Sequence, residues 1–229
     1  MKYLFFLLVV VCFSFTTPLN LNYFNGEFKV KKSLNFNNSG MSNFTYNASC
    51  NLYTDSVSLN QLWKSQNLGE VLYNNIPLTY NNTINLYIDS AVRKTNQYVN
   101  WELKNSTFFT PFAVSIDTTF PSFSYHNCLP SIIDRSQNLE VILDSLNNVD
   151  FVEITSYNNL LGNLPYYRKF QPHNGLNQII ITKSELRNMS GSGTIVTISL
   201  IKNSFKRING RNFKFEKRFD FVKAMPLVN

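Results

Sequence analysis

The residues of this chain that are best suited to catalysis are a histidine and a cysteine two positions apart. His126 and Cys128 would point to the same face of a strand, because side chains alternate between faces along it. Such a pair can form an activated nucleophile when a third group orients the histidine. We interpret this pair as structural, because Tyr125 and Asn127 beside the histidine are typical of a turn. A secreted hydrolase combining His126 or His173 with a carboxylate remains an alternative.

Motifs for cofactors are absent from the sequence. The two histidines and the two cysteines outside the N-terminal segment are too few and too scattered for a zinc site. The acidic residues lack the spacing of a calcium-binding loop. Gly-rich phosphate loops, dinucleotide fingerprints and G-x-S-x-G elbows are also missing. We therefore expect no metal, no cofactor, no nucleic-acid partner and no enzymatic activity.

Aromatic residues are the candidates for ligand binding. Tyr166 and Tyr167 precede Arg168 in a loop with Asn and Pro, where they could offer ring faces and donors to a sugar or a polyanion. The alternative is that the tyrosines pack this loop onto the fold. Trp63 and Trp101 could stack on a carbohydrate, or they could be core residues. Exposure of these four rings would distinguish a carbohydrate-binding module from a structural role.

The first 18 residues have the layout of a secretory signal peptide. Lys2 precedes an apolar run over residues 3–15, and Thr16-Thr17-Pro18 follows it. The run is too short for a membrane-spanning helix, and no later segment approaches the ~20 apolar residues that a span needs. We expect cleavage after residue 18, a secreted or cell-envelope location, and no transmembrane span in the mature chain. The formal charge of +7 suits anionic envelope surfaces, and it also simply favours solubility.

The cysteines carry a prediction of their own. Cys12 lies in the signal segment and would leave with it, so that Cys50 and Cys128 remain. An even number of cysteines in an exported chain predicts one disulfide between them. The alternative is two free, buried cysteines.

Runs rich in β-branched and aromatic residues recur along the rest of the chain, separated by clusters of Asn, Gly, Ser and Pro. A short helical turn is expected at residues 183–187, between two of the later runs. The expected strands are 23–36, 44–53, 70–73, 84–89, 98–103, 108–116, 139–143, 150–157, 177–182, 194–201 and 213–222.

These runs predict an all-β fold with two small antiparallel β-sandwich domains. Proline steps at Pro111, Pro121 and Pro130 favour extended chain, and we place the domain junction near the first of them. The N-terminal β-rich domain would comprise residues 19–111. Residues 112–229 would form the second domain, which is immunoglobulin-like in the number and spacing of its strands.

The last two runs predict a β-hairpin with Asn209-Gly210 in its loop. Along the second arm, apolar and charged residues alternate, and Lys217 interrupts the apolar series. We interpret the charged series as a solvated face whose mixed signs suppress edge pairing. The apolar series is Phe213, Phe215, Phe219 and Phe221, and the charged series is Lys214, Glu216, Arg218 and Asp220.

A series of short motifs suggests a resemblance. They are Leu68-Gly69-Glu70-Val71, Tyr87, Trp101, Thr119-Phe120-Pro121-Ser122-Phe123, Leu129-Pro130, Asp150-Phe151-Val152 and the Asn209-Gly210 hairpin. In this order the chain resembles uncharacterised secreted, immunoglobulin-like β-sandwich proteins of Gram-negative bacteria over residues 45–229. The resemblance implies architecture and export, and it brings no activity with it.

The sequence as a whole favours a non-catalytic interaction or structural module of the envelope or extracellular space. Its partner would be a protein or a polysaccharide of the cell surface. A carbohydrate-binding module is the first alternative to this interpretation, and the secreted hydrolase is the second.

Overall fold

The computed structural model describes residues 23–37, 40–41, 44–58, 65–89, 98–157, 166–172, 177–189 and 191–228. The expected signal peptide, Cys12, Trp63 and His173 lie outside the described residues. Almost all of the described elements are strands, which confirms the predicted all-β fold class.

In chain order the elements are β1 (Tyr23–Asn37), β2 (Gly40–Met41), β3 (Thr45–Ser58), β4 (Glu70–Tyr73), β5 (Ile76–Pro77), β6 (Thr79–Asn81), β7 (Leu86–Ile88), β8 (Tyr98–Lys104), β9 (Phe112–Asp117), β10 (Ile133–Asp134), β11 (Leu139–Ile142), β12 (Phe151–Tyr157), β13 (Tyr166–Phe170), β14 (Gln178–Ile181), α1 (Lys183–Leu186), β15 (Gly193–Ile208) and β16 (Arg211–Val228). Each expected run of residues contains or overlaps one of these strands. The four-residue helix α1, which a capping box at Thr182 begins, confirms the expected helical turn.

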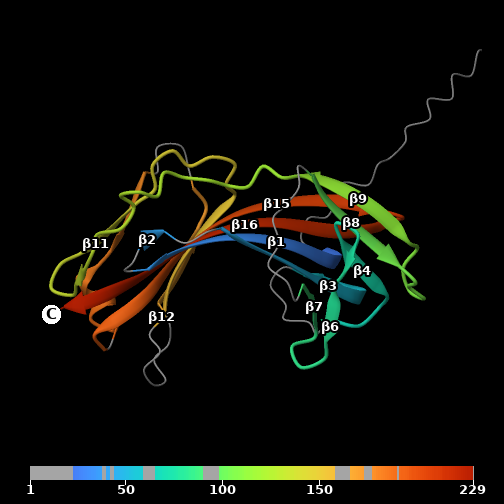
Figure 1. The fold of residues 1–229 in the computed structure, drawn as a ribbon, viewed down its shortest axis with the longest axis horizontal. Coiled ribbons are helices and arrows are strands. Elements are labelled where there is room, and N and C mark those ends of the chain that lie inside the picture. Colours follow the sequence, from blue (N-terminus) through green and yellow to red (C-terminus); the bar gives the residue numbers. More distant parts are fainter. Residues whose placement is uncertain are drawn as a thin grey trace, which may run out of the picture.

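One long sheet organises the molecule. Its strand order among the described residues is β13-β12-β15-β16-β1-β3-β7-β6, with β2 beside β1 and β10 beside β16. A sheet of order β5-β4-β8-β9 and the pair β11-β14 are separate from it. Figure 1 shows β1, β15 and β16 running along the molecule, with β8 and β9 near one end and β11 near the other.

The predicted C-terminal hairpin is confirmed, and it is longer than the sequence pattern indicated. Strands β15 and β16 pair antiparallel from Gly193↔Pro226 to Ile208↔Arg211. Asn209 and Gly210 both have positive φ, at 50° and 79°, as a type I′ turn requires. A side chain at position 210 would meet no neighbour, so glycine is needed there for its backbone conformation.

Two hydrophobic cores lie on the same face of the long sheet. Phe213 and Phe215 of β16 belong to the first, which includes Trp101 of β8 and which we call the β8 core. Phe219 and Phe221 belong to the second, which includes Val152 of β12 and which we call the β12 core. Each buried aromatic side chain contributes about 2–3 kcal/mol to folding through apolar burial. The long strands therefore join two separate cores.

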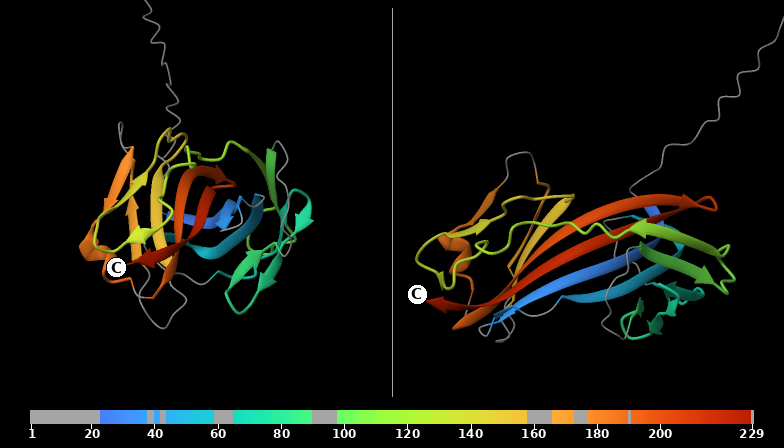
Figure 2. Two further views of the ribbon diagram at one scale, coloured as in Figure 1. Left: turned by 60° about the vertical axis from the view of Figure 1, so that its left-hand side comes forward. Right: turned by 45° about the horizontal axis from the view of Figure 1, so that its top comes forward.

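The long sheet does not divide at residue 111, where the sequence suggested a domain junction. Strand β1 pairs in parallel with β16, from Gly26↔Phe213 to Phe36↔Lys223. The C-terminal strand thus contributes to both cores. The proline-containing segment between β9 and β10 does cross from one core to the other, which gives the sequence its appearance of a junction (Figure 2).

The disulfide prediction is wrong. Cys50 and Cys128 are both free and buried, Cys50 in the β8 core and Cys128 in the β12 core. Burial raises the pKa of the Cys128 thiol to about 12 and raises that of Cys50 well above its usual value. Both thiols are therefore uncharged and apolar at neutral pH, which suits the two cores that hold them.

Within the described residues, the structure has no helix that is long and apolar enough to cross a membrane.

Candidate functional site

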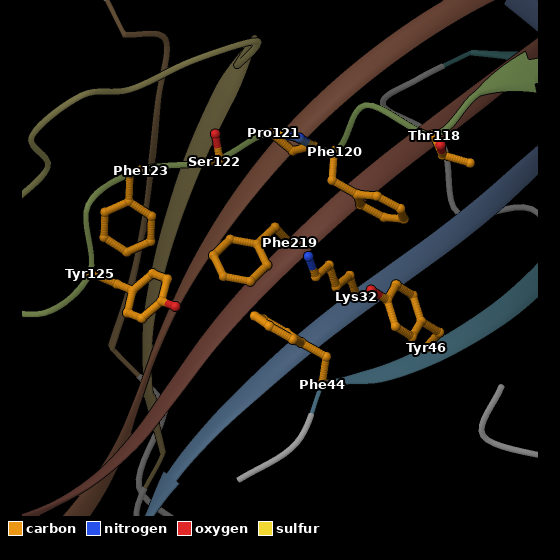
Figure 3. Close-up of a pocket in the computed structure, with 10 residues that line it drawn as sticks. All are labelled: Lys32, Phe44, Tyr46, Thr118, Phe120, Pro121, Ser122, Phe123, Tyr125 and Phe219. Atoms are coloured by element: carbon orange, nitrogen blue, oxygen red, sulfur yellow. The ribbon is translucent and has the colours of Figure 1, made fainter. Parts of the chain in front are cut away.

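A pocket lies on the core-bearing face of the long sheet, beside the β12 core. It has a volume of about 410 Å³, within the range of small-molecule sites. Strands β1, β3 and β16 contribute to its wall, and the segment after β9 closes the other side (Figure 3). Its lining residues are Lys32, Phe44, Tyr46, Thr118, Phe120, Pro121, Ser122, Phe123, Tyr125 and Phe219. We call it the aromatic pocket.

Hydrogen bonds hold the segment after β9 in place. The Asp117 carboxylate accepts a hydrogen bond from the Thr119 amide at 2.8 Å. The Asn148 side chain donates to the Thr119 carbonyl at 3.0 Å. Ser122 and Asn147 exchange two backbone hydrogen bonds, of 2.9 and 3.1 Å. Both side-chain and backbone hydrogen bonds therefore fix this wall of the pocket.

Phe219 of β16 contacts three other aromatic rings of the pocket. Its ring centroid lies 6.2 Å from that of Phe123 and 6.4 Å from those of Phe44 and Tyr125. Because Phe219 and Phe123 are buried in the β12 core, they are rigid. Phe44 is exposed, and the Tyr125 ring is half-buried. The pocket therefore combines a fixed apolar floor with accessible ring surface.

Lys32 is the pocket's cation. Its ammonium lies 4.1 Å from the centroid of the Phe44 ring, and it is about 6 Å from the rings of Tyr46 and Phe219 (Figure 3). These are cation–π distances. Among the described residues, no carboxylate or carbonyl oxygen pairs with this ammonium. Its N–H donors therefore face aromatic rings and the open pocket.

Lys32 belongs to a row of three lysines that cross the core-bearing face between the two cores. Lys202 of β15 lies directly opposite Lys217 of β16. Lys217 lies opposite Val30 of β1, and Lys32 is two residues further along that strand, on the same face. We call Lys202, Lys217 and Lys32 the lysine row.

Two members of the lysine row have carboxylate partners. The Lys202 ammonium lies 2.6 Å from an Asp150 carboxylate oxygen, and the Lys217 ammonium lies 2.7 Å from one of Asp117. The hydrogen bond from Lys217 holds the pKa of Asp117 below its usual value, and the Thr119 amide adds to this effect. Lys32 differs from both in having no such partner among the described residues.

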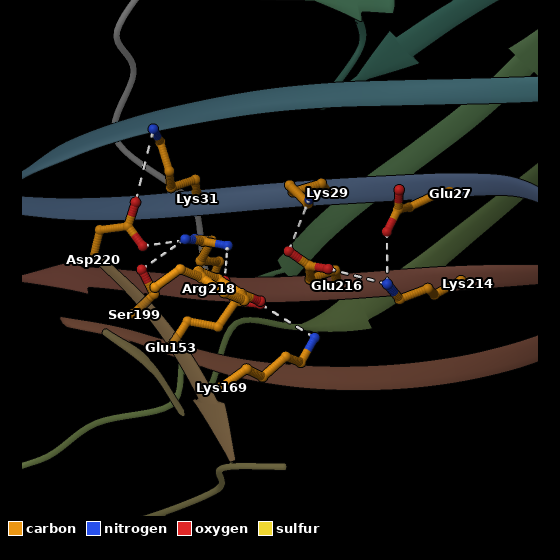
Figure 4. Close-up of polar contacts among 11 residues, drawn as sticks. Glu27, Lys29, Lys31, Glu153, Lys169, Ser199, Lys214, Glu216, Arg218 and Asp220 are labelled. Atoms are coloured by element: carbon orange, nitrogen blue, oxygen red, sulfur yellow. Dashed lines mark hydrogen bonds and ion pairs between the residues drawn. The ribbon is translucent and has the colours of Figure 1, made fainter. Parts of the chain in front are cut away.

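The opposite face of the same strands carries a network of charged side chains. It extends from β13 across β12, β15 and β16 to β1 (Figure 4). We call it the polar stripe, and its members are Glu27, Lys29, Lys31, Glu153, Lys169, Ser199, Lys214, Glu216, Arg218 and Asp220.

Cations and carboxylates alternate within the polar stripe. Oxygens of Glu216 lie 3.1 Å from the ammonium groups of Lys29 and Lys214. Arg218 binds Glu153 at 2.9 Å and Asp220 at 2.7 Å. Burial alone would raise the pKa of Glu216, but Lys29 and Lys214 outweigh it and the pKa is lowered. The carboxylate is therefore ionised at neutral pH.

The interpretation of this charged series as a solvated edge face is wrong. Strand β16 lies inside the sheet, between β15 and β1, and the Glu216 side chain is only 6% exposed. Partly exposed lysines of neighbouring strands neutralise the buried carboxylates. Each charged member of the stripe thus has an oppositely charged partner, and these pairs connect neighbouring strands of the sheet.

The predicted ligand-binding aromatics do not converge on one site. Trp101 is fully buried in the β8 core, which fits the core alternative and not stacking on a carbohydrate. Tyr166, Tyr167 and Arg168 lie on strand β13 rather than in a loop. Trp63 lies outside the described residues.

On β13, only one of the predicted binding residues offers an open ring. The Tyr167 side chain is 57% exposed and donates to the Glu153 carboxylate at 3.3 Å. Tyr166 packs against the β12 core. Arg168 donates to the Ile180 carbonyl at 3.1 Å. These contacts attach β13 to its neighbours.

His126 and Cys128 do not form an activated nucleophilic pair, as the structural interpretation expected. His126 is exposed and its ring lies 4.9 Å from that of Tyr125, whereas Cys128 is buried with a raised pKa. His173 lies outside the described residues. Across the described part of the chain, no group of three or more His, Cys, Asp or Glu side chains could hold a metal ion.

Sequence reasoning missed the aromatic pocket, although one signal was present. Phe28, Val30 and Leu34 alternate along the expected strand at 23–36, and Lys32 interrupts that apolar series. Lys217 interrupts the series of the C-terminal strand in the same way. The parallel pairing of β1 with β16 brings these two interruptions together, and no local pattern predicts that pairing.

No protein-family model, curated protein or solved structure matches this chain.

Proposed function

We propose that this protein is an exported, non-catalytic interaction module that binds a carbohydrate of the cell surface in its aromatic pocket. One observation carries the proposal. The pocket combines accessible aromatic rings with a lysine that has no carboxylate partner among the described residues. Ring faces bind the C–H faces of sugars, and polar groups at the rim bind their hydroxyls.

The chemistry of the lining supports binding rather than catalysis. The described lining residues provide rings, hydroxyl groups and one ammonium. General acid–base catalysis works best with a group whose pKa lies near the operating pH, typically a histidine or a perturbed carboxyl. The lining residues are of neither type.

Export is the second part of the proposal. It rests on residues 1–18, whose single cation, apolar run and small polar end are typical of a signal peptide. Two reduced cysteines do not argue against export, because both are buried, one in each core.

A glycan and envelope-polysaccharide array tests this function, with purified protein applied at low and at high salt. High salt removes non-specific attraction from the basic chain, whereas ring stacking persists. We expect binding that survives salt and that Phe44→Ala weakens by about tenfold or more. Tyr157→Ala is the matched control, because Tyr157 is an exposed aromatic residue outside the pocket. Binding that salt abolishes, no binding, or equal losses in the two variants would overturn the proposal.

A further inference from the structure

We infer that the aromatic pocket selects an acidic sugar and that the ligand's carboxylate pairs with Lys32. The inference rests on the proposed carbohydrate-binding function and names the class of sugar. The inference comes from a different observation, which is the comparison of Lys32 with the other two members of the lysine row.

In the lysine row, a lysine between the two cores usually pairs with an aspartate of the same chain. Lys202 and Lys217 each lie within 2.7 Å of an aspartate oxygen. Lys32 lies on the same face, also between the two cores, but its neighbours are the rings of Phe44, Tyr46 and Phe219. A ligand carboxylate in the pocket would give Lys32 the partner that the other two lysines find within the chain.

The surroundings of Lys32 strengthen such a pairing. Its side chain is half-buried, and the Phe44 ring lies 4.1 Å from the ammonium and covers one side of it. In such a site a charge-assisted hydrogen bond is roughly twice as strong as a neutral one.

The rest of the lining fits the body of an acidic sugar. A hexuronic acid has one apolar C–H face, hydroxyls around its rim and a single carboxylate. The rings of Phe44 and Phe120 can stack on the apolar C–H face of the sugar. Hydroxyl groups on the same lining can bond to the sugar hydroxyls, and they belong to Tyr46, Tyr125 and Ser122. A phosphate or sulfate would bind better to several cations or to an arginine fork. Lys32 is the one cation among the described lining residues, which suits a single carboxylate.

Calorimetric titration with a trigalacturonate tests the inference. The comparison ligands are its methyl ester, the neutral trisaccharide of galactose and a sulfated galactose oligomer. We expect the acid to bind about tenfold or more tightly than the ester and the neutral sugar, and Lys32→Met to remove that advantage. Lys31→Met is the matched control. It removes the same charge from the adjacent residue, which faces the polar stripe, and should bind the acid as the natural chain does.

The results separate the failure of the inference from that of the proposed function. Salt-resistant binding of the neutral sugar or the methyl ester with the affinity of the acid would overturn the inference and keep the function. A preference for the sulfated oligomer, or an equal loss in the two lysine variants, would also overturn the inference. Binding of none of these ligands would overturn it too, and the array would then show whether any carbohydrate binds. Thermal unfolding of both variants controls for loss of the fold.

Discussion

Lys31 and Lys32 are neighbours in the chain, yet they lie on opposite faces of β1 in different environments. Lys31 reaches Asp220 in the polar stripe, with 3.9 Å between the charged atoms. Lys32 reaches three aromatic rings in the pocket. Alternation along the strand separates the two roles. One face uses its cations to join strands, and the other leaves a cation available to a ligand.

The two faces should therefore respond differently to the loss of a charge. In the polar stripe, loss of one member takes a neutralising partner from side chains that are largely buried, which is destabilising. In the pocket, removal of the lysine leaves rings and solvent, so stability changes little and binding changes much. The predictions below test this difference in order of expected size.

Loss of Glu216 should have the largest effect on stability. Glu216→Ala removes the carboxylate that Lys29 and Lys214 share, and Lys214 keeps Glu27 as its partner at 2.7 Å. We expect the free energy of unfolding to fall by about 2–3 kcal/mol in urea denaturation. Glu140→Ala, at an exposed position of β11, is the control and should change it by less than about 0.5 kcal/mol. Similar small losses in both variants would show that the stripe does not hold the sheet.

Acid should weaken the fold by protonating Glu216 of the polar stripe and Asp117, the partner of Lys217. The pKa of Glu216 lies below its unfolded value of 4.5, and that of Asp117 lies below 3.8. Their contribution to stability is complete above those unfolded values and is lost as the pH falls through the lower, folded values. The melting temperature should therefore drop as the pH falls below about 4.5, and less steeply in Glu216→Ala. A parallel decline in both proteins would contradict this assignment.

Replacement of Lys217 or Lys32, both in the lysine row, should have a smaller effect on stability. The two replacements should differ in their effect on sugar binding. Lys217→Met frees Asp117, whose side chain is 66% exposed and can be solvated, so we expect a loss of about 1 kcal/mol. Lys32→Met removes cation–π contacts and should cost about 0.5–1 kcal/mol. Urea denaturation and acid-sugar titration of both variants provide the check. Loss of binding in Lys217→Met alone would contradict the role given to Lys32.

Reduction of the protein should have no effect on its stability, because the structure has no disulfide between Cys50 and Cys128. This result tests whether the two cores are joined by the long sheet without a covalent bridge. Because Cys50 and Cys128 are free and lie in different cores, a reducing agent should leave the melting temperature unchanged. A thiol reagent should modify neither residue until the chain unfolds. A shift in gel mobility on reduction of the monomer would reveal a bridge and contradict the structure.

Local patterns in the sequence predicted most of the strands. Alternation and composition placed β4 at 70–73 and β8 at 98–103, close to their observed bounds. Asn209-Gly210 predicted the hairpin because its residues adopt positive φ readily. These features depend on short-range geometry, which the residues themselves determine.

The features that the sequence could not supply depend on pairing between distant strands. Alternating charges on β16 show that the strand has a charged face, but not that β1 and β12 bring partners to it. The parallel pairing of β1 with β16 also determines that Lys32 meets Phe219. For Trp101 the local pattern did favour burial, because Val99, Trp101 and Leu103 alternate with polar residues along β8. The pocket thus arises from long-range pairing.

The most direct test of the difference between the two faces is fluorine NMR of protein labelled with fluorotyrosine. Tyr46 and Tyr125 line the aromatic pocket, whereas Tyr167 bonds to Glu153 in the polar stripe. Single Tyr→Phe variants assign each resonance. On addition of trigalacturonate, we predict shifts at Tyr46 and Tyr125 and none at Tyr167. A shift at Tyr167 with none at the two pocket tyrosines would place binding on the polar stripe and contradict the account.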